Sequence, residues 1–195
     1  MRERLTSRIG RALRGLRAHE SKLVFHDRAL DAVPTVIRLT SPAFSDHARL
    51  PARYTVDGEG LSPPLAWTGV PRTAASLVII AEDADSPTPL PLVLAIVWAL
   101  PGEDGELPAG ALPRSGDLLP QGMSMGRSSL LTVGYLPPDP PSGHGTHRYA
   151  FEVFALDSRP RLDAREAAPG RGRVLEWLTE HAIAKGILVG LYKRT

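Results

Sequence analysis

The chain of 195 residues is 43% hydrophobic, as expected for one soluble domain with an extension. It has no cysteine, which excludes disulfides, thiolate metal sites and a cysteine nucleophile. Residues 1–28 hold eight basic and three acidic residues, whereas the remainder holds 15 and 18. The basic charge therefore belongs to the N-terminal arm, and we expect no nucleic-acid-binding face. We also expect a cytoplasmic protein, because the sequence shows neither a membrane-spanning run nor the apolar core of a secretory signal.

The N-terminal arm, residues 1–30, precedes a domain expected over residues 31–195. Residues 3–18 are predicted to form a basic amphipathic helix, because four apolar residues recur at spacings of four, four and three: Leu5, Ile9, Leu13 and Leu16. Such a helix can dock on the domain, on a protein partner or on a second copy in a homodimer. It can also lie on a membrane surface as a peripheral contact. Disorder and an organellar presequence are further interpretations.

Strand-like segments dominate the rest of the chain. Apolar and β-branched runs bounded by turn residues predict strands at 36–40, 52–56, 76–81, 92–100, 148–156 and 187–192. Residues 101–129 are rich in Gly, Pro and Ser and are predicted to be mainly loop. One helix is expected at 171–185, with an apolar side and Gly186 as its stop. Many strands with few helices favour a mainly β, sheet-on-sheet sandwich.

Ionisable residues gather beside two of these strands. Asp83 and Asp85 follow a strand that is expected to be buried, and unpaired buried charge is costly, so at least one should face a cleft or a paired network. His147, Arg148 and Tyr149 open a later strand, and alternation places His147 and Tyr149 on one face. A histidine and a tyrosine that donate hydrogen bonds suit a phosphate or carboxylate ligand. A core tyrosine and a histidine bonded to the backbone is the alternative.

Two patterns resemble enzyme motifs. Gly122-Met123-Ser124-Met125-Gly126 matches G-x-S-x-G, but that motif has meaning only between a strand and a helix, which is not the predicted context here. His144 and His147 could hold a metal with Asp83 or Asp85, although a glycine-rich turn is a poor platform for it.

Taken together, the motifs resemble the phosphatidylethanolamine-binding protein family, specifically its bacterial Raf-kinase-inhibitor-like branch. The resemblance covers about residues 35–194. Its anchors are the segments 57–71 (DGEGLSPPLAWTGVP), 83–87 (DADSP), Gly134-Tyr135, 140–149 (PPSGHGTHRY) and Gly190-Leu191-Tyr192.

The resemblance implies a Greek-key β-sandwich with a large and a small sheet, and a non-catalytic binding protein without a cofactor. Its anion pocket would accept phosphate or a phosphorylated head group. By position, the ligand-binding residues would be Asp83, Asp85, Pro87, Pro140, Pro141, His147 and Tyr149. The resemblance further implies that Arg148 is structural and pairs with an acidic group such as Asp85. Pro87 matches a family proline that is commonly cis, which implies a cis bond here.

The sequence departs from the family pattern at four positions. Ala84 replaces a proline, and Leu94 replaces one of two pocket histidines. A glycine expected near Pro137 is absent, and an asparagine expected near Ser124 has become serine. Loss of a charge-assisted donor at position 94 would weaken the binding free energy of an anion by about 1.5–3 kcal/mol. Three hypotheses follow: a binding protein that acts through this pocket, and that regulates a protein partner; a pocket-deficient interaction protein that acts through residues 3–18; and a hydrolase that uses Ser124.

Overall fold

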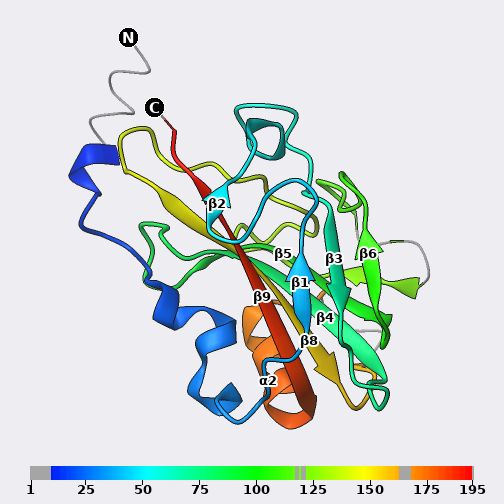
Figure 1. The fold of residues 1–195 in the computed structure, drawn as a ribbon. Helices are drawn as coiled ribbons and strands as arrows, with labels where there is room; N and C mark the ends of the chain where they lie inside the picture. Colours follow the sequence, from blue (N-terminus) through cyan, green and yellow to red (C-terminus); the bar gives the residue numbers. More distant parts are fainter. Residues whose placement is uncertain (1–9, 117–118, 120–121, 163–167, 195) are drawn as a thin grey trace.

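A six-stranded sheet forms the centre of the molecule (Figure 1). The computed structural model describes residues 10–116, 119, 122–162 and 168–194. In spatial order the strands are β2 (Ala48–Arg49), β9 (Ala182–Tyr192), β8 (His147–Leu156), β4 (Ser76–Asp83), β5 (Leu92–Pro101) and β7 (Ser124–Met125). All neighbours are antiparallel except β2 and β9, which run parallel.

A second, three-stranded antiparallel sheet covers one face of the central sheet. It consists of β1 (Arg38–Thr40), β3 (Leu65–Thr68) and β6 (Gly105–Leu107), in that order. The prediction of a mainly β protein with two sheets and few helices is confirmed.

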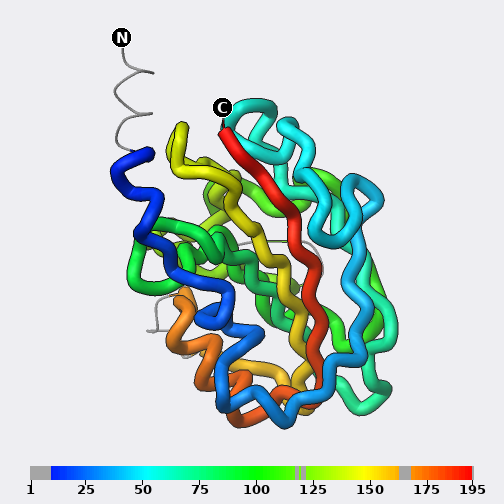
Figure 2. Tube along the Cα trace, turned by 60° about the vertical axis from the view of Figure 1, so that its left-hand side comes forward, coloured from blue at the N-terminus to red at the C-terminus, as the bar shows by residue number. Residues whose placement is uncertain are grey.

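Strand β4 separates two hydrophobic cores, and all eight of its residues are buried. Leu77 and Ile79 face the core shared with the small sheet, while Val78 and Ile80 face the other core. Helix α2 (Arg171–His181) covers this second core together with the 3₁₀ turns η2 (Val24–His26) and η3 (Arg28–Leu30), which lie on the same side of the sheet (Figure 2). The preceding 3₁₀ turn η1 (Glu20–Lys22) has no buried residue. Part of the N-terminal arm therefore contributes core residues, and the domain boundary at residue 30 stays a prediction.

The helix expected over residues 3–18 is wrong in its C-terminal half. Residues 1–9, with Leu5 and Ile9, lie outside the described residues; residues 10–12 are helical, 13–15 form a turn and 16–19 are not helical. The Leu13 carbonyl accepts from Leu16 N–H, which closes a turn one residue shorter than that of an α-helix, and the carbonyls of Leu13 and Leu16 both face the side chain of His144. Leu16 is 56% exposed, so it forms no buried stripe with Leu13.

Two further segments differ from expectation. Residues 52–56 contain the 3₁₀ turn η4 (Ala52–Tyr54) in place of a strand, because both the amide and the hydroxyl of Thr55 donate to the Ala52 carbonyl. Helix α2 ends at His181, and β9 begins at Ala182 because it pairs with β8 over almost its whole length.

The described residues of segment 101–129 are mainly loop, as predicted, but they include β6 and β7. None of the helices in the described ranges is long and apolar enough to span a membrane.

Candidate functional site

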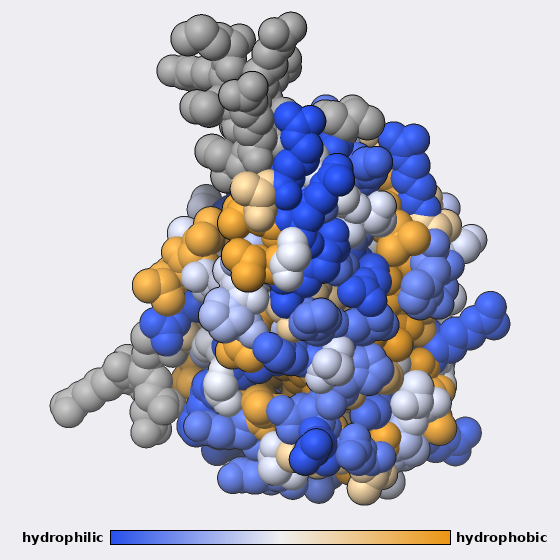
Figure 3. All heavy atoms as spheres, turned by 90° about the vertical axis from the view of Figure 1, so that its left-hand side faces the viewer, coloured by the Kyte–Doolittle hydropathy of each residue, from blue (hydrophilic) through white to orange (hydrophobic). Residues whose placement is uncertain are grey.

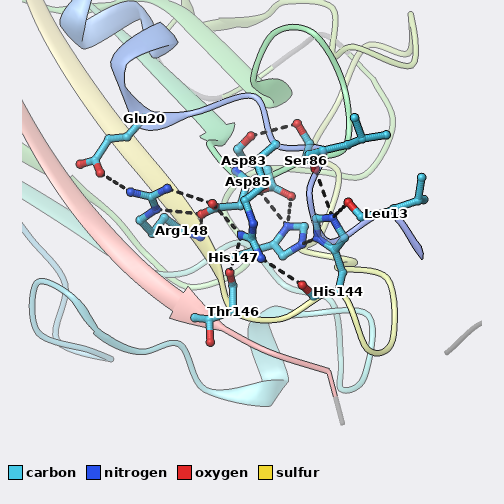
Figure 4. A network of polar contacts seen from close by, with 11 residues as sticks. Leu13, Glu20, Asp83, Asp85, Ser86, His144, Thr146, His147 and Arg148 are labelled. Atoms are coloured by element: carbon cyan, nitrogen blue, oxygen red, sulfur yellow. Dashed lines mark hydrogen bonds and ion pairs between the residues drawn. The ribbon is translucent and has the colours of Figure 1, made fainter. Parts of the chain in front are cut away.

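The two polar segments predicted from the sequence, 83–87 and 140–149, meet because β4 and β8 are neighbours in the sheet. Asp83 at the end of β4 lies opposite Tyr149 near the start of β8. His147 and Tyr149 share a face, and their rings stack with centroids 6.1 Å apart. Arg148 points to the other side, toward Asp85 and Glu20 (Figure 4). Segments about 60 residues apart in sequence thus form one polar cluster at this end of the sheet.

A cavity of about 390 Å³ opens beside this cluster, within the range usual for small-molecule sites. Fourteen residues line it: Val56, Asp83, Ser86, Pro87, Thr88, Leu92, Leu94, Arg114, Leu130, Leu136, Pro137, Asp139, Pro141 and His147.

Four of the seven expected ligand-binding residues line the cavity, namely Asp83, Pro87, Pro141 and His147. The other three, Asp85, Pro140 and Tyr149, lie outside its lining. The described part of the chain has no cis peptide bond, so the expectation of a cis Pro87 is wrong for this structure.

A buried chain of hydrogen bonds runs from the cavity wall to the N-terminal segment (Figure 4). Asp83 Oδ2 lies 2.8 Å from His147 Nδ1, His147 Nε2 lies 2.6 Å from His144 Nδ1, and His144 Nε2 lies 2.8 Å from the Leu13 carbonyl oxygen. Both histidines are fully buried. Since both ring nitrogens of His147 are engaged, it has no free donor for a ligand in this arrangement.

Asp85 is the centre of a second network. Arg148 donates to it from the backbone N–H, from Nε at 2.8 Å and from Nη2, and Arg17 donates from Nη1 at 2.7 Å. Burial opposes ionisation of this carboxyl, but the hydrogen bonds from Arg148 and Arg17 outweigh it and hold the pKa of Asp85 far below its usual value. Arg148 therefore pairs with Asp85, the acidic group that the resemblance suggested for it.

Tyr149 is buried in the core, and its hydroxyl has no hydrogen-bond partner among the described residues. Burial, together with the nearby charge of Asp83, raises the pKa of this hydroxyl well above its usual value. The hydroxyl is thus a neutral donor that lies outside the cavity lining.

Sequence reasoning missed the contact between the N-terminal segment, residues 10–20, and the loop before β8. Arg14 Nε donates to the Gly143 carbonyl at 2.6 Å, and Arg17 donates to the carbonyls of His144 and Thr146. Ala18 N–H donates to the Ser86 carbonyl at 3.0 Å. The arginines were visible in the sequence only as a basic helix face, and no pattern there indicates that backbone carbonyls are their partners.

Leu94, the residue found where a histidine was expected, is 3% exposed and lines the cavity. Arg114 also lines it, and sequence reasoning did not single it out. Its only sequence context is a loop rich in Pro and Gly, which gives no signal of a site.

The two enzyme-like patterns lack the required surroundings. Ser124 lies on the two-residue strand β7 opposite Trp98, and across the described ranges no hydrogen bond joins it to a histidine. The rings of His144 and His147 bond to each other, so those nitrogens are engaged. In the part of the chain with described placement, no three His, Asp or Glu residues are grouped to hold a metal ion.

The fold and cavity define a mainly β protein with two sheets and a small-molecule-sized pocket at the end of the larger one. The family model for phosphatidylethanolamine-binding protein matches residues 40–193. The chain belongs to the phosphatidylethanolamine-binding protein family.

Relatives in archaea and bacteria agree with this assignment. A UPF0098 protein of Methanothermobacter thermautotrophicus is 39% identical over 160 residues, which are 81% of this chain and 99% of that protein. The crystal structure of the PEBP homolog CT736 from Chlamydia trachomatis matches with a TM-score of 0.72 at 33% identity, over 83% of this chain and 99% of that one. The structure of YbcL from E. coli, described as a new member of the mammalian PEBP family, matches with a TM-score of 0.74 at 26% identity, over 83% and 100%.

Proposed function

We propose that this chain is a non-catalytic binding protein whose cavity takes a small anionic or phosphorylated ligand. The observation that carries the proposal is the convergence of separate sequence motifs on one cavity of about 390 Å³, with Asp83, Pro87, Pro141 and His147 in its wall. Membership of the family supports the same function. Asp85, Pro140 and Tyr149 would then support the wall from behind, and Arg148 would hold Asp85.

A titration with phosphorylethanolamine, followed by NMR, tests this function in the wild type and in Leu94→His. We expect the ring signal of His147 and the amides of the cavity wall, such as that of Thr88, to shift at millimolar ligand or below. Leu94→His should tighten binding roughly tenfold to hundredfold, because it adds a charge-assisted donor. The proposal fails if neither protein shows a shift in any cavity residue.

A second function has its own supporting observation. His147 is saturated by Asp83 and His144, and the N-terminal segment is bound to the loop that carries His144. This arrangement favours an interaction protein in which the arm, not the cavity, meets a protein partner, a second copy or a membrane surface. Light scattering of the full chain and of a variant that lacks residues 1–20 tests the homodimer form. An unchanged mass after the deletion excludes it.

Some finer expectations remain proposals. They are a Greek-key connection of the two sheets, a boundary between arm and domain near residue 30, a cytoplasmic location and regulation of a protein partner. The hydrolase hypothesis is tested by ester hydrolysis in the wild type and Ser124→Ala, and we expect no activity that depends on Ser124.

A further inference from the structure

The charged groups in the cavity wall are not equally available to a ligand. Asp83 is paired with His147, and Asp139 is paired with Arg194 at 2.5 Å. Arg114 is exposed, and among the described residues no hydrogen bond or ion pair engages its guanidinium. The free charge that the wall offers is therefore a cation at Arg114.

Arg114 lies at one side of the cavity, beside Pro137. A Cβ atom added to Gly60 would lie 3.4 Å from Arg114 Nη1 and 3.2 Å from Pro137 Cγ, so the guanidinium and this wall proline are close neighbours. An anion at Arg114 would stay close to the cavity. An anion at His147 would meet the carboxylate of Asp83, which is already bonded to that ring.

Much of the remaining wall is apolar. Leu92 lies opposite Asp83 across the β4–β5 pair, and Leu94 follows two residues later on the same face. Leu130 and Leu136 add to this surface, and Leu130 is 63% exposed. Figure 3, which views the side where the N-terminal segment lies, shows that apolar side chains also gather at the surface of this side of the molecule.

The cavity is large for a simple anion. At roughly 30 Å³ for each water in the liquid, its volume of about 390 Å³ corresponds to about a dozen waters. A phosphate ion would leave most of the leucine surface in contact with water, whereas an attached hydrocarbon would displace that water favourably.

We infer, resting on the proposed function, that the ligand is an amphipathic anion. Its phosphate or carboxylate group pairs with Arg114, and its short aliphatic or aromatic body packs on Leu92, Leu94 and Leu136. Arg114 is thus the anion-binding residue and Leu94 the residue that sets specificity for an apolar body.

Calorimetric titration of the full chain with inorganic phosphate, ethyl phosphate and butyl phosphate tests this inference. Each CH₂ buried against the leucines should strengthen binding about fourfold. Phosphorylethanolamine, which carries an ammonium where butyl phosphate carries hydrocarbon, should bind more weakly than butyl phosphate. That comparison distinguishes a ligand with an apolar body from a bare lipid head group.

Arg114→Gln should weaken the binding of butyl phosphate roughly tenfold to hundredfold. Arg72→Gln is the matched control, because Arg72 is exposed and precedes β4 at the end opposite Asp83, roughly 25 Å away for an eight-residue strand. Leu94→Asn should reduce the gain in affinity from ethyl phosphate to butyl phosphate, while the affinity for inorganic phosphate stays unchanged.

Two results would overturn the inference in different ways. If inorganic phosphate binds as tightly as butyl phosphate and Arg114→Gln has no effect, the cavity binds anions but elsewhere in its wall, and the proposed function survives. If no probe produces heat or shifts a cavity amide, both the inference and the proposed function fail.

Discussion

His144 Nδ1 and His147 Nε2 lie 2.6 Å apart, and the other nitrogen of each ring faces an acceptor, the Leu13 carbonyl for His144 and Asp83 for His147. A carbonyl and an ionised carboxylate can only accept hydrogen bonds. Each outer contact therefore needs a proton on a ring nitrogen, and the central contact needs a third. Three protons on two imidazoles give the pair one positive charge, which balances Asp83.

This proton count predicts that three of the four ring nitrogens are protonated when the chain of bonds is complete. Nitrogen-15 NMR of the imidazole rings measures it directly. Two neutral rings with an unchanged contact to Leu13 would contradict the count.

The same chain predicts that His144 anchors the N-terminal segment. His144→Ala removes the donor to the carbonyls of Leu13 and Leu16, so amide exchange at residues 13–18, corrected for intrinsic rates, should accelerate at least severalfold. Exchange in β4 should stay unchanged. His26→Ala is the control, because His26 is exposed on η2.

Asp85 is expected to contribute to stability in a pH-dependent manner. Its pKa is lowered in the folded protein, so the unfolded chain, with a usual value of about 3.9, takes up the proton first as the pH falls. The contribution is present above about pH 4 and is lost progressively below it. Asp85→Asn removes charge from a nearly buried carboxylate that two arginines contact, and should lower the free energy of unfolding by about 3 kcal/mol at pH 7.

Urea unfolding at pH 7 and pH 3 measures both effects. The variant should be less stable than the wild type at pH 7, and the difference should be smaller at pH 3, where part of the contribution of Asp85 has been lost. Glu106→Gln, at an exposed carboxylate on β6, should change the free energy of unfolding by no more than about 0.5 kcal/mol. A variant that is equally destabilised at both pH values would show that packing, not charge, is the cause.

The contribution of Glu152 to stability is expected to have the opposite pH dependence. It is fully buried on β8, accepts a hydrogen bond from Phe25 N–H at 3.0 Å, and its Oε1 has no partner among the described residues. Burial and the nearby charge of Glu82 raise the pKa of Glu152 well above its usual value. The folded protein then binds a proton that the unfolded chain releases above about pH 4.3, so stability falls as the pH rises.

Glu152→Gln keeps an acceptor for Phe25 and removes the ionisable group. The loss of unfolding free energy between pH 5 and pH 8 should therefore be smaller than in the wild type, by at least about 1 kcal/mol. Glu106→Gln on the exposed part of β6 is the matched control. Parallel pH profiles for Glu152→Gln and the wild type would show that Glu152 does not titrate in this range.

The long strands could be predicted from sequence because each carries its own signal. Strand β4 carries a continuous apolar run from Leu77 to Ala81, and β8 is rich in aromatic residues. The two strands pair in register along their length. The short strands β2 and β7 have two residues each. Their only cause is pairing with β9 and β5, a tertiary effect that no local pattern records.

The candidate site shows the same division. The order of the motifs allowed Asp83, Pro87, Pro141 and His147 to be predicted as site residues, and these four line one cavity. The partner of each group could not be predicted from sequence. His147 is bonded to His144, and His144 is bonded in turn to the carbonyl of Leu13, 131 residues before it in the chain. The position of Tyr149 outside the lining depends on the side-chain packing around its ring.

Gly186 illustrates how a local rule can mislead. It was expected to stop a helix at 171–185, but it lies inside β9, and a Cβ atom there would come 2.2 Å from the Ile37 carbonyl oxygen. The glycine is required by close backbone approach in the sheet and not by helix termination.

Gly186→Ala should therefore lower the free energy of unfolding by about 1–3 kcal/mol, because the β9 backbone or the chain at Ile37 must shift. Gly172→Ala is the matched control: Gly172 lies in helix α2, and an added Cβ would meet nothing within 4 Å. The free energy of unfolding of that variant should rise by up to about 1 kcal/mol, because alanine has a higher helix propensity than glycine. Thermal and urea unfolding of both variants measure the contrast, and a Gly186→Ala protein as stable as the wild type would show that Ile37 moves aside without cost.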